Sequence, residues 1–192
     1  MSQWGEFHLY DLFTIDAGSK LDRKDVNLFP GSDYNYIGRT GDNNGIIGTC
    51  NRVNIKKKSP YPAGALTVSL GGTVGATFVQ QKPFYTSQNV DVLQPSQSMS
   101  DGAKWFVASC IYREAVLNYS AFVKELNKHI KTDFYIKLPI TPDGKPDWQY
   151  MDNYIANLAA RAHKDVSSLN QVKPKSHKIN IDNWKEIGRA HV

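Results

Sequence analysis

Several features are scarce in this sequence of 192 residues, and each scarcity excludes a class of protein. The two cysteines, Cys50 and Cys110, stand far apart and form no C-x-x-C motif, which argues against a disulfide framework and indicates a reducing environment. No apolar run approaches the ~20 residues that cross a bilayer. The first ten residues, MSQWGEFHLY, lack the basic and apolar regions of a signal peptide. We therefore expect a cytoplasmic protein without membrane contact.

Catalytic and metal-binding motifs are missing as well. The sequence contains no G-x-G-x-x-G, no P-loop and no G-x-S-x-G elbow. Its five histidines are scattered without ligand spacing, so we expect no metal site. Asp22-Arg23-Lys24 has the D-x-K form of many nucleases but lacks an acidic partner upstream. These absences predict a non-catalytic chain that holds no cofactor of its own.

The composition is that of a folded protein with a basic surface. Hydrophobic residues make up 41% and charged residues 21%, which is ordinary for a globular domain. Lys and Arg number 23 against 18 for Asp and Glu, giving a net charge of +5. This excess favours a polyanionic partner, although a solvated basic surface has the same composition.

The hydrophobic pattern predicts an α+β fold whose β-rich domain, residues 1–145, carries long polar loops. Gly64–Gln80 contains β-branched and aromatic residues broken by glycines, which predicts two strands and a tight turn. Asn89–Pro95 alternates apolar and polar residues, and Phe134–Ile140 resembles a further strand. Between these strands, residues from Ala103 to about Ile130 have helical spacing and predict two helices.

A long helix is predicted over residues 146–171, beginning at Pro146-Asp147. Apolar residues recur there every three or four positions, as in a coiled coil. One interpretation is an amphipathic helix packed on its own domain, and the other is a spacer helix that pairs with another helix. The seam of the second interpretation consists of Trp148, Met151, Ile155, Leu158, Ala162 and Leu169, with Val166 one step off register.

The last residues suggest a linker and a repeat. Residues 172–186 begin with the basic stretch VKPKSHK, after which Asn183-Trp184-Lys185-Glu186 echoes Gln3-Trp4-Gly5-Glu6. We interpret this segment as a linker and the start of a second copy of the domain. The final residues, 187–192, read IGRAHV, which one frame of a common sequencing adapter encodes, and we interpret them as a non-native tail.

Polar and cationic side chains in the predicted loops match those that contact DNA. Arg can pair with guanine, and Asn or Gln with adenine, while clustered Lys and Arg suit phosphates. Asn and Gly also favour turns for purely local reasons, so each residue has a structural alternative. The candidate DNA-contact residues are Arg39, Thr40, Asn43, Asn44, Arg52, Lys56, Lys57, Lys58, Gln80, Gln81, Lys82, Ser87 and Asn89.

Four segments carry a family resemblance: WGEFHLYDLFTIDAG, YNYIGRTGDNNGIIG, GALTVSLGGTVGATFVQQKPFYTSQNVDVL and IKLPITPDGKPDWQYM. In this order they resemble the target-recognition domain of restriction-modification specificity subunits, of Type I systems or the similar Type IIB systems. The resemblance covers roughly residues 3–186. It does not transfer base contacts residue by residue, because the recognition loops are what differs between specificities.

The resemblance implies a function and a set of partners. It implies recognition of double-stranded DNA, two such domains per subunit separated by long helices, and docking to methyltransferase subunits that use S-adenosylmethionine. In Type I systems a restriction and motor subunit joins them. One alternative is the recognition domain of a fused restriction-methylation enzyme. Another is a β-rich module for nucleotides or carbohydrates, with Tyr34, Tyr36 and Tyr61 as stacking platforms.

Overall fold

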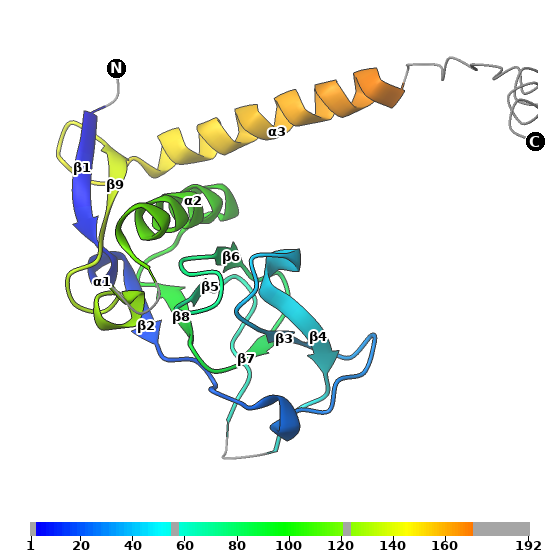
Figure 1. The fold of residues 1–192 in the computed structure, drawn as a ribbon. Coiled ribbons are helices and arrows are strands. Elements are labelled where there is room, and N and C mark those ends of the chain that lie inside the picture. The colour runs from blue at the N-terminus through cyan, green and yellow to red at the C-terminus, as the bar shows by residue number, and fades with distance from the viewer. Residues whose placement is uncertain (1–2, 55–57, 121–123, 171–192) are drawn as a thin grey trace, which may run out of the picture. The chain divides into compact units, whose positions relative to one another are not determined.

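The computed structural model describes residues 3–54, 58–120 and 124–170 (Figure 1). Lys56 and Lys57, the linker at 172–186 and the tail at 187–192 therefore lie outside the described residues. The chain divides into two compact units, residues 1–157 and 158–192. Within the described part, no helix is both long and apolar enough to cross a membrane.

The first unit contains all the described strands. The elements in chain order are β1 (Gln3–His8), α1 (Leu9–Leu12), β2 (Phe13–Asp16), η1 (Arg23–Asp25), β3 (Tyr34–Ile37), η2 (Asn43–Gly45), β4 (Ile46–Cys50), β5 (Leu66–Ser69), β6 (Thr77–Val79), β7 (Phe84–Thr86), β8 (Val90–Pro95), α2 (Asp101–Asn118), η3 (Leu126–Lys128), β9 (Tyr135–Ile140) and α3 (Trp148–Asn170). The strands predicted within 64–80, 89–95 and 134–140 are confirmed as β5 with β6, β8 and β9.

The strands form three sheets. β1 and β9 make an antiparallel pair, and β2-β8-β5-β6 make a four-stranded antiparallel sheet. The third sheet, β4-β3-β7, combines an antiparallel β3–β4 hairpin with a parallel β3–β7 pair. The mixture of sheets and helices agrees with the predicted α+β class.

The main core lies between the four-stranded sheet and α2, which crosses it (Figure 1). Val107 and Ile111 of α2 pack with Leu66 and Leu93 of the sheet, and all four are 0% exposed. The opposite face of α2 is open, since Trp105 is 47% exposed. This helix therefore has one buried face and one accessible face.

The region predicted as two helices contains one. α2 ends at Asn118 because Tyr119 adopts an extended backbone, with φ −129° and ψ 146°. In the rest of that region, as far as the structure describes it, the helical segment is the single 3-10 turn η3. The prediction of a second helix is therefore wrong for the described residues.

The start of α3 belongs to the first unit and packs within it. Met151 is completely buried in the main core, and Trp148 and Ile155 pack against it. Their own domain thus buries Met151 and partly covers Trp148 and Ile155, so the assignment of these three seam residues to a partner helix is corrected. In the second unit, Leu158, Val166 and Leu169 are 51%, 56% and 68% exposed.

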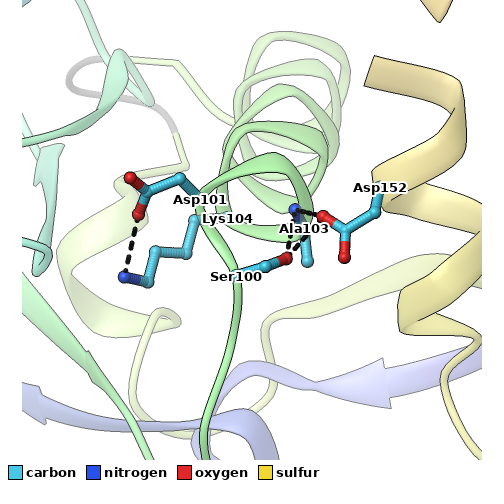
Figure 2. A network of polar contacts seen from close by, with 5 residues as sticks. All are labelled: Ser100, Asp101, Ala103, Lys104 and Asp152. Carbon is cyan, nitrogen blue, oxygen red and sulfur yellow. Dashed lines mark hydrogen bonds and ion pairs between the residues drawn. The ribbon is translucent and has the colours of Figure 1, made fainter. Parts of the chain in front are cut away.

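A carboxylate on α3 caps α2 (Figure 2). Asp152 Oδ1 accepts hydrogen bonds from the Ala103 amide, at 3.0 Å, and from the Ser100 hydroxyl, at 2.5 Å. Ser100 also caps α2 directly, because its Oγ accepts from the same amide at 3.2 Å. Gly102 permits this approach, since a Cβ there would lie 2.5 Å from Asp152 Oδ1. The beginnings of the two helices are therefore joined by polar contacts.

Candidate nucleic-acid interface

Three loops meet beyond the ends of β3, β5 and β7. The Thr73 amide donates to the Arg39 carbonyl oxygen at 3.0 Å, and the Leu70 amide donates to that of Asn89 at 2.9 Å. The Ser87 amide donates to the carbonyl oxygen of Ile37 at 2.8 Å. Predicted residues from two separate stretches of sequence, Arg39 from one and Ser87 and Asn89 from the other, are thus brought into one loop cluster.

Left-handed backbone is concentrated in these loops. The non-glycine residues with positive φ in the described chain are Lys20, Asn43, Asn44 and Asn89, at 53°, 47°, 53° and 57°. Lys20 contacts this loop cluster, because Gln88 Nε2 donates a hydrogen bond to the Lys20 carbonyl oxygen at 3.0 Å. Such backbone is unfavourable for L residues and often marks sites where a loop is held for a function. Lys20 was not predicted, since nothing in the local sequence indicates its φ.

A pair of glycines allows the loops to approach each other. A Cβ on Gly72 would lie 2.7 Å from the Arg39 carbonyl oxygen. A Cβ on Gly71 would lie 3.7 Å from Arg39 Nη1 and 3.9 Å from Asn89 Nδ2. The guanidinium of Arg39 and the amide of Asn89 therefore flank the same glycine. Both residues are exposed, and together they present groups that can bind guanine, adenine or phosphate.

Other predicted residues use their side chains within the protein. Thr40 Oγ1 accepts from the Asp42 amide at 3.1 Å, and Asn43 Nδ2 donates to the Ile46 carbonyl oxygen at 3.1 Å. Both side chains thus shape the loop, while Asn43 and Asn44 remain exposed.

The structure contradicts the prediction for Gln80. It is 1% exposed, and its Nε2 donates to the Asn44 carbonyl oxygen at 3.0 Å and to Thr67 Oγ1 at 2.9 Å. A buried amide with two internal hydrogen bonds cannot reach DNA without leaving them. Gln80 therefore supports the loop from inside, and the prediction that it contacts DNA is wrong.

Arg52 and Lys82 lie at the other end of the β4-β3-β7 sheet. Arg52 follows Cys50, which pairs with Tyr34 at the start of β3. Lys82 precedes Pro83, whose carbonyl oxygen accepts from the Asn35 amide at 3.0 Å. Four residues of strand span about 13 Å, so Arg52 and Lys82 are separated from Arg39 by roughly the length of β3. Lys58, Gln81 and Lys82 are exposed, as is Arg52.

Two carboxylates, those of Asp91 and Asp16, have partners within the protein. Asp91 is 3% exposed, and its Oδ2 lies 3.5 Å from Lys131 Nζ. Burial raises the pKa of Asp91 more than the attraction of Lys131 lowers it. Asp16 Oδ1 accepts a hydrogen bond from the Tyr61 hydroxyl, and burial together with this bond raises the pKa of Tyr61 far above its ordinary range. Tyr61 therefore stays protonated and acts as a donor to Asp16.

The tyrosines predicted as stacking platforms do not form one. Tyr36 is 1% exposed and its hydroxyl donates to the Leu21 carbonyl oxygen at 2.8 Å. Tyr34 packs edge-on against Tyr85, and Tyr61 stacks on Phe84. Residues 3–54, 58–120 and 124–170 also contain no group of three or more His, Cys, Asp or Glu that could hold a metal ion.

Comparison with known proteins gives consistent results. The family model described as "Type I restriction modification DNA specificity domain" matches residues 1–167. The chain is 24% identical over 155 residues to the specificity subunit S.BcgI of a Type II restriction enzyme from Heyndrickxia coagulans, covering 81% of this chain and 43% of that protein. The chain thus spans less than half the length of this relative.

Solved structures share the fold. The S subunit of a Type I restriction-modification system from M. genitalium superposes with a TM-score of 0.61 at 14% identity, over 88% of this chain and 42% of that one. The HsdS subunit of Thermoanaerobacter tengcongensis gives a TM-score of 0.57 at 15% identity, over 88% of this chain and 40% of that one.

Proposed function

Because the chain belongs to the Type I restriction modification DNA specificity domain family, we propose that it recognises double-stranded DNA as the specificity subunit, or a half-subunit, of a restriction-modification complex. In this proposal the chain is not catalytic. It directs a methyltransferase, which binds S-adenosylmethionine, and a restriction subunit in systems that have one. In the similar Type II systems, the same kind of recognition domain would direct different partner subunits.

The observation that carries the proposal is the loop cluster around Gly71 and Gly72. Arg39 and Asn89 are exposed on either side of these glycines, and their backbones are fixed by hydrogen bonds from Thr73 and Leu70. A guanidinium and an amide held by rigid loops suit direct contact with base edges or phosphates. Arg52 and Lys82 form a second group, near the start of β3, which suits the phosphate backbone further along a duplex.

The second half of α3 supplies the proposed pairing surface. Leu158, Ala162 and Leu169 continue the predicted seam, and Val166 lies one step off its register. The exposure of Leu158, Val166 and Leu169 supports a role in pairing with a helix of a partner subunit or of a second recognition domain.

The test measures DNA binding at several salt concentrations. Mapping methylated adenines in the host first identifies the DNA word. Arg39→Ala should then weaken binding to that word more than binding to unrelated duplex if Arg39 contacts a base. The double variant Arg52→Ala/Lys82→Ala should weaken both equally and reduce the slope of log K against log salt by roughly one per lost phosphate contact.

Free mononucleotides provide the contrasting ligand. If they bind and duplex DNA does not, the proposal is wrong and the chain is a nucleotide-binding module.

A further inference from the structure

A cavity of about 480 Å³ lies between α2, β6 and the loop that carries Arg39. Its volume is within the range of roughly 300–1,000 Å³ in which proteins bind small organic groups. None of the residues that line it is charged. They include Trp105, Ser109 and Tyr112 of α2, Phe78 of β6, Asn44 of the loop and Gln81 after β6.

The lining combines aromatic rings with neutral polar groups. Trp105 and Tyr112, seven residues apart on the open face of α2, are 47% and 45% exposed. Asn44 and Gln81 contribute amides, and Ser109 contributes a hydroxyl. Rings that can stack, together with neutral donors and acceptors, match a flat heterocycle with a hydrogen-bonding edge. A phosphate would find no cation among the lining residues.

The position of the cavity indicates where such a heterocycle would come from. Gly41 and Asn44, which line the cavity, belong to the same loop as Arg39. The buried Gln80 amide holds this loop beside β6 through the Asn44 carbonyl oxygen at 3.0 Å. A ligand on the Arg39 loop is therefore next to the cavity.

We propose that this cavity receives one nucleobase that has left the stack of the bound DNA, with Trp105 and Tyr112 as stacking surfaces. The inference rests on the proposed function, since it takes duplex DNA as the source of the base. Enzymes that modify a base extrude it from the duplex, so a DNA segment under methylation contains unstacked bases.

The test uses the whole chain and three end-labelled forms of one mixed-sequence DNA: a paired duplex, the same duplex with a single bulged 2-aminopurine, and the single strand. The chain should bind the bulged duplex about tenfold more tightly than the paired one, as expected for stacking of one base on an aromatic side chain. Binding should also quench the 2-aminopurine fluorescence. Trp105→Ala should remove both effects and leave the affinity for paired duplex unchanged.

Two further variants separate a site effect from a folding effect. Ser109→Phe, which fills the cavity from an exposed position, should also remove the preference for the bulge. Trp4→Ala, which removes an equally exposed tryptophan on β1, should keep it.

The outcomes distinguish the two proposals. Binding to paired duplex without preference for the bulge and without quenching would overturn the cavity proposal and leave the proposed function intact. Binding of free 2-aminopurine riboside without any binding to DNA would overturn both.

Discussion

The hydrogen bond from the Thr73 amide to the Arg39 carbonyl oxygen joins two loops that are more than thirty residues apart in sequence. Gly72 lies against this contact, with φ at 68°. At this residue two requirements coincide, a left-handed backbone and the absence of a side chain. The position of Arg39 therefore depends on the absence of a side chain at Gly72.

Gly72→Ala should destabilise the protein and displace the Arg39 loop. The new Cβ would lie 2.7 Å from the Arg39 carbonyl oxygen, in addition to a strain of about 1–2 kcal/mol for the left-handed backbone. Gly31→Ala is the matched control, because Gly31 has φ at 79° and nothing within 4 Å of the added Cβ. Urea unfolding should show a larger loss for Gly72→Ala. An equal loss of unfolding free energy in the two variants would mean that the Arg39 loop moves away from the added Cβ at no cost.

Asp91 should give the stability an unusual pH dependence. Its pKa is raised in the folded protein, first by burial, so its favourable contribution is present below the ordinary value of 3.8 and is lost as pH rises through the folded pKa. The unfolding free energy of the wild type should therefore fall relative to that of Asp91→Asn as pH rises from about 4. Urea unfolding across this pH range measures the difference.

Asp133 provides a control of opposite sign. Hydrogen bonds from His129 and Thr132 lower the pKa of this exposed carboxyl group, so its contribution is lost as pH falls through the folded pKa. Relative to Asp133→Asn, the wild type should lose stability on acidification. The same trend for both variants would contradict the assigned cause of the Asp91 shift.

At the scale of elements, the sequence predicts local features better than distant pairings. β5, β6 and β8 are predictable because alternation and flanking Gly or Pro are local signals. The parallel β3–β7 pair is not, since it joins residues about fifty positions apart without a pattern that specifies the register. The end of α2 was also missed, because apolar spacing continues past Tyr119 while the backbone does not remain helical.

The candidate site was predictable in the same limited way. Residue type directed attention to the loops that contain Arg39 and Asn89, because cations, amides and glycines are concentrated there. Their convergence depends on tertiary hydrogen bonds that the sequence does not reveal. The burial of Gln80 was missed because a polar residue after a strand is usually exposed, whereas here two internal hydrogen bonds from Nε2 hold the buried amide. Trp105 and Tyr112 have the seven-residue spacing of one helix face, a signal that could have identified them.

The stabilising effect of the polar contacts between α2 and α3 can be measured by substituting Asp152. Asp152→Ala removes an acceptor from the first turn of α2 and should reduce the unfolding free energy by about 1 kcal/mol, as for other helix caps. Asp152→Asn keeps a side-chain oxygen there and should retain most of the stability. Urea denaturation of both variants is the measurement. If alanine and asparagine behave like the wild type, Ser100 alone is sufficient to cap α2.

At the scale of the whole molecule, partner assembly should depend on the exposed seam of α3. Leu158→Lys/Leu169→Lys places two charges in the proposed pairing surface and should abolish co-purification with the methyltransferase subunit. Ala160→Lys, on a different face of the same helix, should leave the complex intact. Sedimentation velocity of the mixtures distinguishes complex from free chain. A complex that survives both charges would exclude this seam as the interface with the methyltransferase subunit.

β1 and β9 close the first unit upon itself. Gln3 pairs with Ile140, so the residue at which β1 begins lies beside the residue at which β9 ends, only eight positions before α3 starts. Entry and exit of the chain are therefore adjacent, as in domains that tolerate insertion into a host protein. Under the proposed function, grafting residues 3–140 of one homologue onto the helix of another should transfer the proposed DNA preference without a change at the junction.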